Sequence, residues 1–280
     1  MKGMVIGAGQ MGGGIAQIMA CSGKTTYLND VNMELVKSRI AFIEKVLSKD
    51  VTKGKITEEQ KEAALKNVIP SVELKDAADC DIVVEAVVEN MEIKGRVFQS
   101  LDKICKPSCI LASNTSSLPI TEIAAFTKRP EKVIGMHFMN PVPVMKLVEL
   151  IRGLATSDET CGFVRNLTLE LGKSPVEVRD VPGFVSNRVL QVMINEAIYC
   201  LYEGVAKAED IDTVLKLGMS HPMGPLQLAD FIGLDTILSV LEIMYAGYGD
   251  PKYRPCPLLR QYVKAGWLGK KSGRGFYRYD

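Results

Sequence analysis

Residues 1–181 alternate short apolar runs with longer segments whose apolar positions recur at helical spacing. Short apolar runs bounded by turn residues are typical of buried strands, and the longer periodic segments are typical of helices. This alternation predicts an α/β fold in which helices cover a largely parallel sheet. The expected strands are 4–7, 25–30, 81–86, 109–112, 132–137, 146–151 and 175–178; the expected helices are 11–22, 33–47, 91–104, a short helix after Pro119, and one from Ser157 or Asp158 to Gly172.

The segment 49–67 interrupts the alternation. It is rich in Lys and Glu and contains no strand-like run. Thr57 is placed to cap a helix over residues 58–66. We therefore expect a helical excursion from the sheet at this point.

The pattern changes at Asp180-Val181-Pro182-Gly183, because residues 182–280 are mostly helical in pattern. This change predicts two domains, 1–181 with alternating strands and helices and 182–280 all-helical. A helix expected over 184–202 is apolar nearly all round and must be buried on several sides. Because a domain of about a hundred residues cannot cover such a helix on every side, we expect a homodimer through the helical domain.

Composition and charge narrow the class of protein. The chain has 280 residues, 47% of them hydrophobic and 24% charged, with a net charge of +1. These values are typical of a globular protein with a large core and predict no nucleic-acid partner. Glycines interrupt the apolar N-terminus and no run is long enough to span a membrane, so neither a signal peptide nor a membrane partner is expected.

The seven cysteines are scattered without CxxC spacing. An odd number in this arrangement fits the reducing cytoplasm better than a disulfide framework. Cys105 and Cys109 are the closest pair and lack a second pair of ligands. We expect them to be ordinary thiols and expect no metal site.

A glycine-rich motif follows the first expected strand. Gly7-Ala8-Gly9-Gln10-Met11-Gly12 matches GxGxxG between a strand and a helix, where such glycines permit a pyrophosphate to bind at a helix N-terminus. Asp30 ends the second strand, 18 residues after Gly12, and can accept hydrogen bonds from a ribose. These residues predict that the domain 1–181 is of Rossmann type, and they favour NAD without excluding NADP; the alternative is a turn that binds nothing.

His137 is one of only two histidines, and it ends a buried strand. Glu149 follows twelve residues later inside another apolar run, on the same strand face as Leu147 and Ile151. An unpaired carboxylate would be costly to bury there, so we expect Glu149 to bond one nitrogen of His137 and leave the other for a substrate. The alternative is a core histidine near an unrelated carboxylate.

The chain as a whole resembles the short-chain (3S)-3-hydroxyacyl-CoA dehydrogenases of the 3-hydroxybutyryl-CoA type. The resemblance rests on seven motifs in order: Gly7 to Gly12, Val84-Glu85-Ala86-Val87-Val88-Glu89-Asn90 with Lys94, Ser113-Asn114-Thr115-Ser116-Ser117, His137-Phe138-Met139-Asn140-Pro141, Pro182-Gly183-Phe184-Val185-Ser186-Asn187-Arg188, His221-Pro222-Met223-Gly224-Pro225, and Lys271-Ser272-Gly273-Arg274-Gly275-Phe276-Tyr277.

The resemblance implies roles for individual residues. His137 would be the catalytic acid/base, Glu149 its partner, and Ser116 and Asn187 polar contacts to the reacting end of an acyl-CoA substrate. Coenzyme A phosphates would contact Lys49 and Lys53. Cofactor contacts would come from the glycine motif, including Gln10 and Met11, and from Asp30, Glu89, Lys94, Asn114, Asn140 and Lys271.

Each implied role has a simpler alternative. Ser116 and Asn187 could cap helices, and capping is the preferred reading for Ser117 before Pro119. Lys94, Lys49 and Lys53 could be ordinary solvated lysines. For the whole chain, the rivals are a dehydrogenase of a small hydroxy acid or sugar acid on the same scaffold, and a non-catalytic nucleotide-binding protein.

Overall fold

The computed structural model describes residues 1–279. They form two compact units that divide between Asp180 and Val181. The first unit contains every strand of the one large sheet that these residues form, and the second is helical. In the described range, no helix is both long and apolar enough to cross a membrane.

The first unit is built on an eight-stranded sheet of order β3-β2-β1-β4-β5-β6-β7-β8. The strands from β3 to β6 are parallel, β7 is antiparallel to β6, and β8 is parallel to β7. The first six strands have the order that binds dinucleotides at the carboxyl ends of the central strands. The strands are β1 (Lys2–Ile6), β2 (Thr25–Asn29), β3 (Val68–Ser71), β4 (Ile82–Glu85), β5 (Ile110–Ser113), β6 (Val133–Phe138), β7 (Leu147–Arg152) and β8 (Ser174–Arg179).

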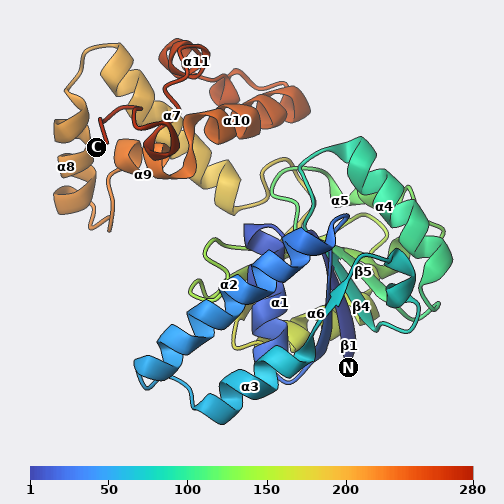
Figure 1. Ribbon diagram of the computed structural model, residues 1–280. Coiled ribbons are helices and arrows are strands. Elements are labelled where there is room, and N and C mark those ends of the chain that lie inside the picture. Colours follow the sequence, from blue (N-terminus) through green and yellow to red (C-terminus); the bar gives the residue numbers. More distant parts are fainter. Residues whose placement is uncertain (280) are drawn as a thin grey trace. The chain divides into compact units, whose positions relative to one another are not determined.

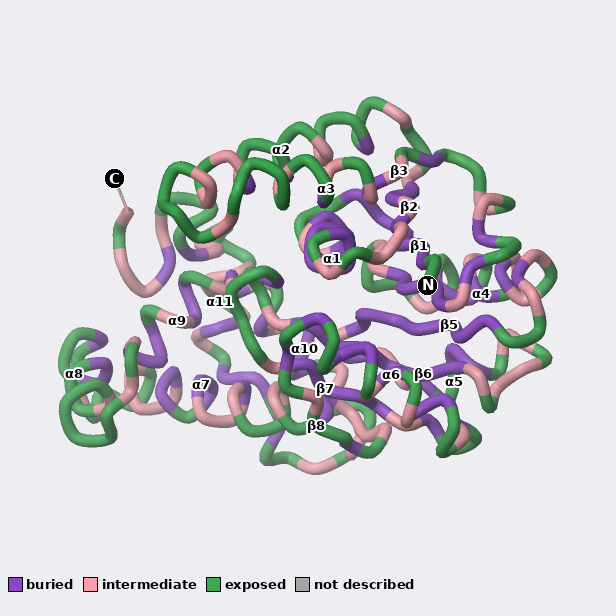
Figure 2. The backbone as a smooth tube through the Cα atoms, turned by 90° about the horizontal axis from the view of Figure 1, so that it is seen from below, coloured by how far each residue is buried: buried purple, intermediate pink, exposed green. Residues whose placement is uncertain are grey.

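Helices cover this sheet. The central strands β4, β5 and β6 are buried along their whole length, as can be followed for β5 and β6 in Figure 2. In Figure 1, α2 and α3 lie together beside α1, which packs on β1 and β2. The helices of this unit are α1 (Gln10–Cys21), α2 (Met33–Thr52), α3 (Glu58–Asn67), α4 (Met91–Ile104), α5 (Ile120–Ala124) and α6 (Asp158–Glu170).

Two elements differ from the expectation. The helix expected to end at residue 47 continues to Thr52. It ends there because Gly54, the next glycine, has a φ of +66°, which a right-handed helix does not allow. The excursion is therefore the end of α2 together with α3, and Thr57 caps α3 as expected. The short strand β3 was not expected from the sequence. It contains Pro70, which is tolerated here because β3 lies at the edge of the sheet.

The second unit consists of helices around its own apolar core. The apolar helix expected over 184–202 begins at Ser186 instead. Phe184 has a positive φ of 51°, which a right-handed helix does not allow. One face of this helix packs inside with Ile194 and Ile198, whereas Val189 on another face is 66% exposed. The helices are α7 (Ser186–Tyr202), α8 (Ala208–Gly218), α9 (Pro225–Ile232), α10 (Leu234–Tyr248) and α11 (Pro257–Lys264).

Candidate active site

The glycine motif forms a tight turn between β1 and α1. Gly7 has a φ of +102°, and a Cβ there would lie 2.5 Å from the carbonyl oxygen of Ala86. A Cβ on Gly12 would lie 1.9 Å from the carbonyl oxygen of Gly7, so only glycine permits this contact. Gly9 is the N-cap of α1, and apart from its neighbours in the chain nothing lies within 4 Å of where its Cβ would be. The N-terminus of α1 therefore faces open space, which suits a phosphate group.

Asp30 lies beside this turn, after the end of β2. Its Oδ2 accepts a hydrogen bond from the backbone N–H of Ala8 at 2.7 Å, and its Oδ1 accepts from Val31 at 2.7 Å. A cavity of about 640 Å³ extends from Asp30 and Gly9 to Val88 across the carboxyl ends of β1, β2 and β4. The residues present therefore fit a dinucleotide whose pyrophosphate binds at α1.

The structure also explains two further glycines in α1. A Cβ on Gly13 would lie 2.2 Å from Cδ of Arg39, whose Nε donates to the carbonyl of Ala8 at 3.0 Å. A Cβ on Gly14 would lie 2.8 Å from Cβ of Val142. These glycines let an arginine from α2 and the loop after β6 pack closely on α1.

His137 and Glu149 lie opposite each other on the antiparallel strands β6 and β7. Nδ1 of His137 lies 2.8 Å from Oε2 of Glu149, and the two residues are 6% and 2% exposed. The expected hydrogen bond is therefore confirmed. Because a carboxylate only accepts, this bond places the proton of a neutral ring on Nδ1 and leaves the lone pair on Nε2. Nε2 lies 3.1 Å from Oγ of Ser116.

Ser116 belongs to a loop after β5 that is held by Glu89. One oxygen of Glu89, Oε1, accepts from the hydroxyl of Thr115 at 2.6 Å, the backbone N–H of Ser116 at 2.9 Å, and the backbone N–H and hydroxyl of Ser117, each at 3.0 Å. The prediction that Ser117 caps a helix is wrong, because its hydroxyl donates to Glu89 and Pro119 is the N-cap of α5.

Glu89 carries a negative charge that its surroundings stabilise. Burial by itself would raise the pKa of Glu89, but the nearby Lys94 ammonium and the hydrogen bonds from the 115–117 loop outweigh it. The pKa of Glu89 consequently lies below its ordinary value.

Lys94 is not the solvated lysine considered as its alternative. It is 1% exposed, and its Nζ lies 2.7 Å from Oε1 of Glu85 and 3.4 Å from Oε2 of Glu89. Glu85 itself is fully buried and was not among the expected site residues. The one signal in the sequence was a charged residue inside the apolar run 81–86.

Gln10, Asn114 and Asn140 have well-defined partners, and Met11 is partly buried. Oδ1 of Asn114 accepts from the backbone N–H of Phe138 at 2.9 Å, which ties the end of β5 to β6. Nε2 of Gln10 donates to Oδ1 of Asn140 at 3.0 Å, and Met11 packs against the core of this unit.

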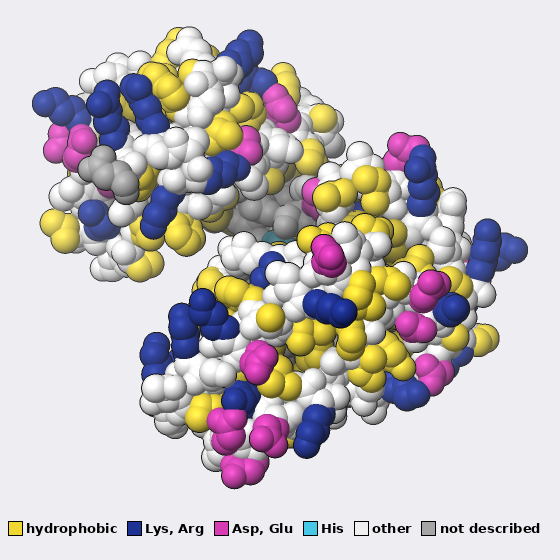
Figure 3. Space-filling view, in the orientation of Figure 1, with side chains coloured by type: hydrophobic (Ala, Val, Ile, Leu, Met, Phe, Trp, Pro, Cys, Tyr) yellow, Lys and Arg dark blue, Asp and Glu magenta, His cyan; other side chains and the backbone are white. Residues whose placement is uncertain are grey.

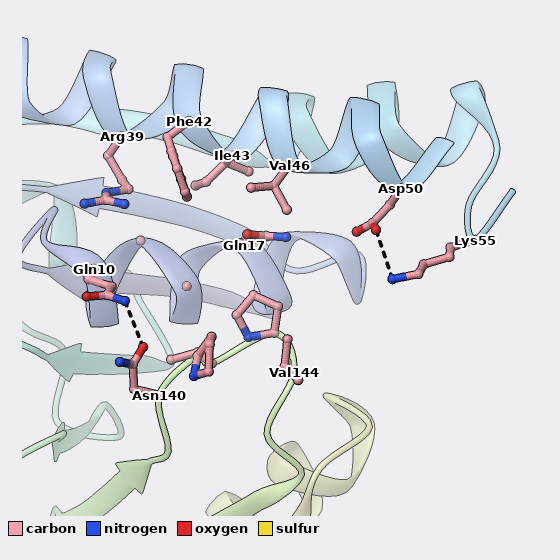
Figure 4. Close-up of a pocket in the computed structure, with 15 residues that line it drawn as sticks. Gln10, Gln17, Arg39, Phe42, Ile43, Val46, Asp50, Lys55, Asn140 and Val144 are labelled. Atoms are coloured by element: carbon pink, nitrogen blue, oxygen red, sulfur yellow. Dashed lines mark hydrogen bonds and ion pairs between the residues drawn. The ribbon is translucent and has the colours of Figure 1, made fainter. Parts of the chain in front are cut away.

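A second cavity of about 670 Å³ lies between α1, α2 and the 140–144 loop (Figure 4). Phe42, Ile43 and Val46 form its wall on α2, and the hydrogen bond between Gln10 and Asn140 lies at one end. At the other end Lys55 forms an ion pair with Asp50 at 3.3 Å.

Lys49 and Lys53 are exposed at the C-terminal end of α2. Figure 3 shows Lys and Arg side chains on the surface over this helix. Neither of the two lines the 670 Å³ cavity, whereas Lys55 does.

Asn187 and Lys271 belong to the helical unit. Asn187 lies in the first turn of α7, where its Oδ1 accepts from Nε2 of Gln191 at 3.3 Å. Nζ of Lys271 donates to Oδ2 of Asp235 at 2.7 Å.

Nearly all of the described chain matches known enzyme domains. The NAD-binding domain of 3-hydroxyacyl-CoA dehydrogenases matches residues 3–181, and the C-terminal domain of the same enzymes matches residues 183–279. The chain belongs to the 3-hydroxyacyl-CoA dehydrogenase family. Its nicotinamide cofactor is accordingly NAD.

Individual members of the dehydrogenase family are close to this chain. It is 63% identical over 277 residues to the probable 3-hydroxybutyryl-CoA dehydrogenase of Bacillus subtilis, covering 99% of this chain and 96% of that protein. It is 54% identical over 275 residues to the 3-hydroxybutyryl-CoA dehydrogenase of Bradyrhizobium diazoefficiens, covering 98% and 94%. The crystal structure of (S)-3-hydroxybutyryl-CoA dehydrogenase from Ralstonia eutropha superimposes with a TM-score of 0.98 at 48% identity, covering 100% and 99%.

Proposed function

We propose that this dehydrogenase interconverts (3S)-3-hydroxybutyryl-CoA and acetoacetyl-CoA, with His137 as the acid/base. The names of the relatives at 54% and 63% identity support the substrate. The observation that carries the chemistry is the buried His137 ring, which is held by Glu149 at Nδ1 and lies against Ser116 at Nε2. This arrangement combines a proton-exchanging group with a fixed orientation.

In the oxidising direction, Nε2 of His137 removes the proton from the 3-hydroxyl of the substrate. Glu149 stabilises the imidazolium that forms, because its carboxylate stays bonded to Nδ1. Ser116 and Asn187 hydrogen-bond the reacting oxygen and orient the thioester. Bound NAD supplies the hydride acceptor. In the reducing direction His137 donates the same proton.

Coenzyme A requires both apolar and cationic contacts, and the region around α2 offers both. The 670 Å³ cavity has apolar walls from Phe42, Ile43 and Val46, which suit the pantetheine arm. We assign the phosphates to Lys49 and Lys53, whose exposed ammonium groups lie at the end of the same helix. We assign the contacts with NAD to the glycine turn and to six further residues: Asp30, Glu89, Lys94, Asn114, Asn140 and Lys271.

A homodimer through the helical unit is part of the same proposal. Several apolar side chains of this unit are exposed, among them Val189 of α7 and Leu217 of α8, at 66% and 81%. Exposed apolar side chains of this kind are often covered by a second copy of the chain. The seven cysteines, all present as free thiols, support a reducing, cytoplasmic location.

The test is the initial rate of NADH oxidation with acetoacetyl-CoA, compared with NADPH and with free acetoacetate. We expect a rate that saturates with acetoacetyl-CoA and prefers NADH. Saturable activity with acetoacetate and none with the thioester would favour a dehydrogenase of small hydroxy acids instead.

A further inference from the structure

Glu85, the last residue of β4, has no assigned role, although its buried carboxylate joins three segments of the chain. Its Oε1 accepts from Nζ of Lys94 on α4 at 2.7 Å and from the backbone N–H of Val87 at 2.7 Å. Its Oε2 accepts from the hydroxyl of Ser113 at 2.7 Å, at the end of the neighbouring strand β5. Every one of these atoms lies at the carboxyl edge of the sheet, next to the loop that carries Ser116.

The first route from Glu85 to this loop passes through Lys94 and Glu89. The Lys94 ammonium lies between the two carboxylates, 2.7 Å from Glu85 and 3.4 Å from Glu89. The other oxygen of Glu89 accepts from the backbone N–H groups of Ser116 and Ser117. The position of Glu89 therefore depends on where Glu85 holds the ammonium.

The second route passes through Ser113. While its hydroxyl donates to Glu85, its oxygen accepts from the backbone N–H of Thr115 at 3.2 Å. Both routes end on the loop whose Ser116 hydroxyl lies 3.1 Å from Nε2 of His137.

Stability alone does not account for a buried ion pair in this place. Removing the two charges from water is costly for each ion, and apolar replacements of similar volume are often as stable or more so. A pair of fixed charges does provide directional contacts at a defined distance. Here these contacts fix Glu89 on one side and Ser113 on the other.

We infer that Glu85 is a positioning residue for the acid/base site, acting through Lys94 and Glu89, and through Ser113, on Ser116. The inference rests on the proposed roles of Ser116 and His137. If Glu85 is neutralised, Glu89 is the remaining counter-ion of the buried Lys94 ammonium. The carboxylate of Glu89 then moves toward Lys94 and away from the loop, and the Ser116 hydroxyl loses its fixed place against His137.

The experiment compares Glu85→Gln with a matched control, Asp102→Asn. Asp102 lies on the same helix as Lys94 and forms a largely buried ion pair with Arg129 at 2.8 Å, remote from the loop. We expect Glu85→Gln to lower kcat with acetoacetyl-CoA by about 10- to 100-fold, the effect of a small misplacement, with KM changed by less than about threefold. Asp102→Asn should lose thermal stability and keep its kcat within about twofold.

A double variant, Glu85→Gln with Lys94→Met, separates positioning from structural support and covers the case in which the single variant does not fold. It removes the buried ammonium that Glu85→Gln leaves with Glu89 as its one counter-ion, so stability should recover relative to Glu85→Gln. Because Glu89 then lacks the ammonium that fixes its position, kcat should stay low and the backbone amides of residues 113–118 should exchange faster than in the wild type. Recovery of kcat together with stability would overturn the inference.

Amide hydrogen exchange gives a second readout that needs no activity. In Glu85→Gln, a peptide covering residues 113–118 should exchange at least about tenfold faster than in the wild type, and in Asp102→Asn it should not. Unchanged exchange in Glu85→Gln would overturn the inference even if the wild type failed to reduce acetoacetyl-CoA. A wild type that does not reduce acetoacetyl-CoA would count against the proposed function. A Glu85→Gln variant with wild-type kcat would count only against the positioning role of Glu85.

Discussion

Glu149→Gln tests the pairing of His137 and Glu149 because it removes the charge and keeps the shape. The two side chains are almost fully buried and joined at 2.8 Å. Glutamine can still accept a hydrogen bond from Nδ1 through its amide oxygen. The substitution therefore removes mainly the electrostatic stabilisation of the imidazolium.

The size of the effect follows from this geometry. Two unit charges about 4 Å apart interact by about 4 kcal/mol at the effective dielectric constant typical of proteins, and hydrogen bonds to charged groups contribute about 1.5–3 kcal/mol. We therefore expect a loss of about 2–4 kcal/mol in the oxidation transition state. That corresponds to a turnover about 30- to 1000-fold lower.

The assay is steady-state turnover across pH, with Glu177→Gln as a control. Glu177 is a half-exposed carboxylate on β8, beside β7, and its loss should change turnover by less than about twofold. In Glu149→Gln the acidic limb of the oxidation profile should move to lower pH, because losing the negative charge disfavours the imidazolium. Wild-type turnover and an unshifted pH profile in Glu149→Gln would refute a catalytic role for the pair of His137 and Glu149.

Three further predictions concern the cofactor, stability and assembly. Asp30→Ala should reduce the preference for NADH over NADPH by about tenfold or more, as the ratio of kcat/KM values, and an unchanged ratio would contradict the ribose contact. Urea unfolding should show that the wild type is more stable than Glu89→Gln at neutral pH, because folding lowers the pKa of Glu89. This difference in stability should disappear as the pH falls below about 4.5. A difference that stays constant with pH would argue against a charged Glu89 in the folded protein. Light scattering at micromolar concentration should give twice the mass of one chain, and a stable monomer would exclude the dimer.

The sequence predicted best the features that depend on local rules. The glycine turn could be located because a GxGxxG motif lay between a strand pattern and a helix pattern. The bond between His137 and Glu149 could be predicted because His137 ends a buried strand and strand alternation places Glu149 on an apolar face. The antiparallel pairing of β6 with β7 places the two residues opposite each other.

The features that were missed depend on contacts between distant segments. The burial of Lys94 results from Glu85 on another element, and no helical pattern indicates it. Ser117 contacts Glu89 across the sheet edge, where the local sequence favoured a cap. Gly13 and Gly14 are explained only by Arg39 and Val142, which pack on α1 in the folded chain.

The most direct test of the proposed function compares the wild type with His137→Gln in acetoacetyl-CoA reduction by NADH. The wild type should turn over the thioester, and His137→Gln should be slower by about two to four orders of magnitude while binding NADH with similar affinity. A folded His137→Gln variant with wild-type turnover would contradict the assignment of His137 as the acid/base.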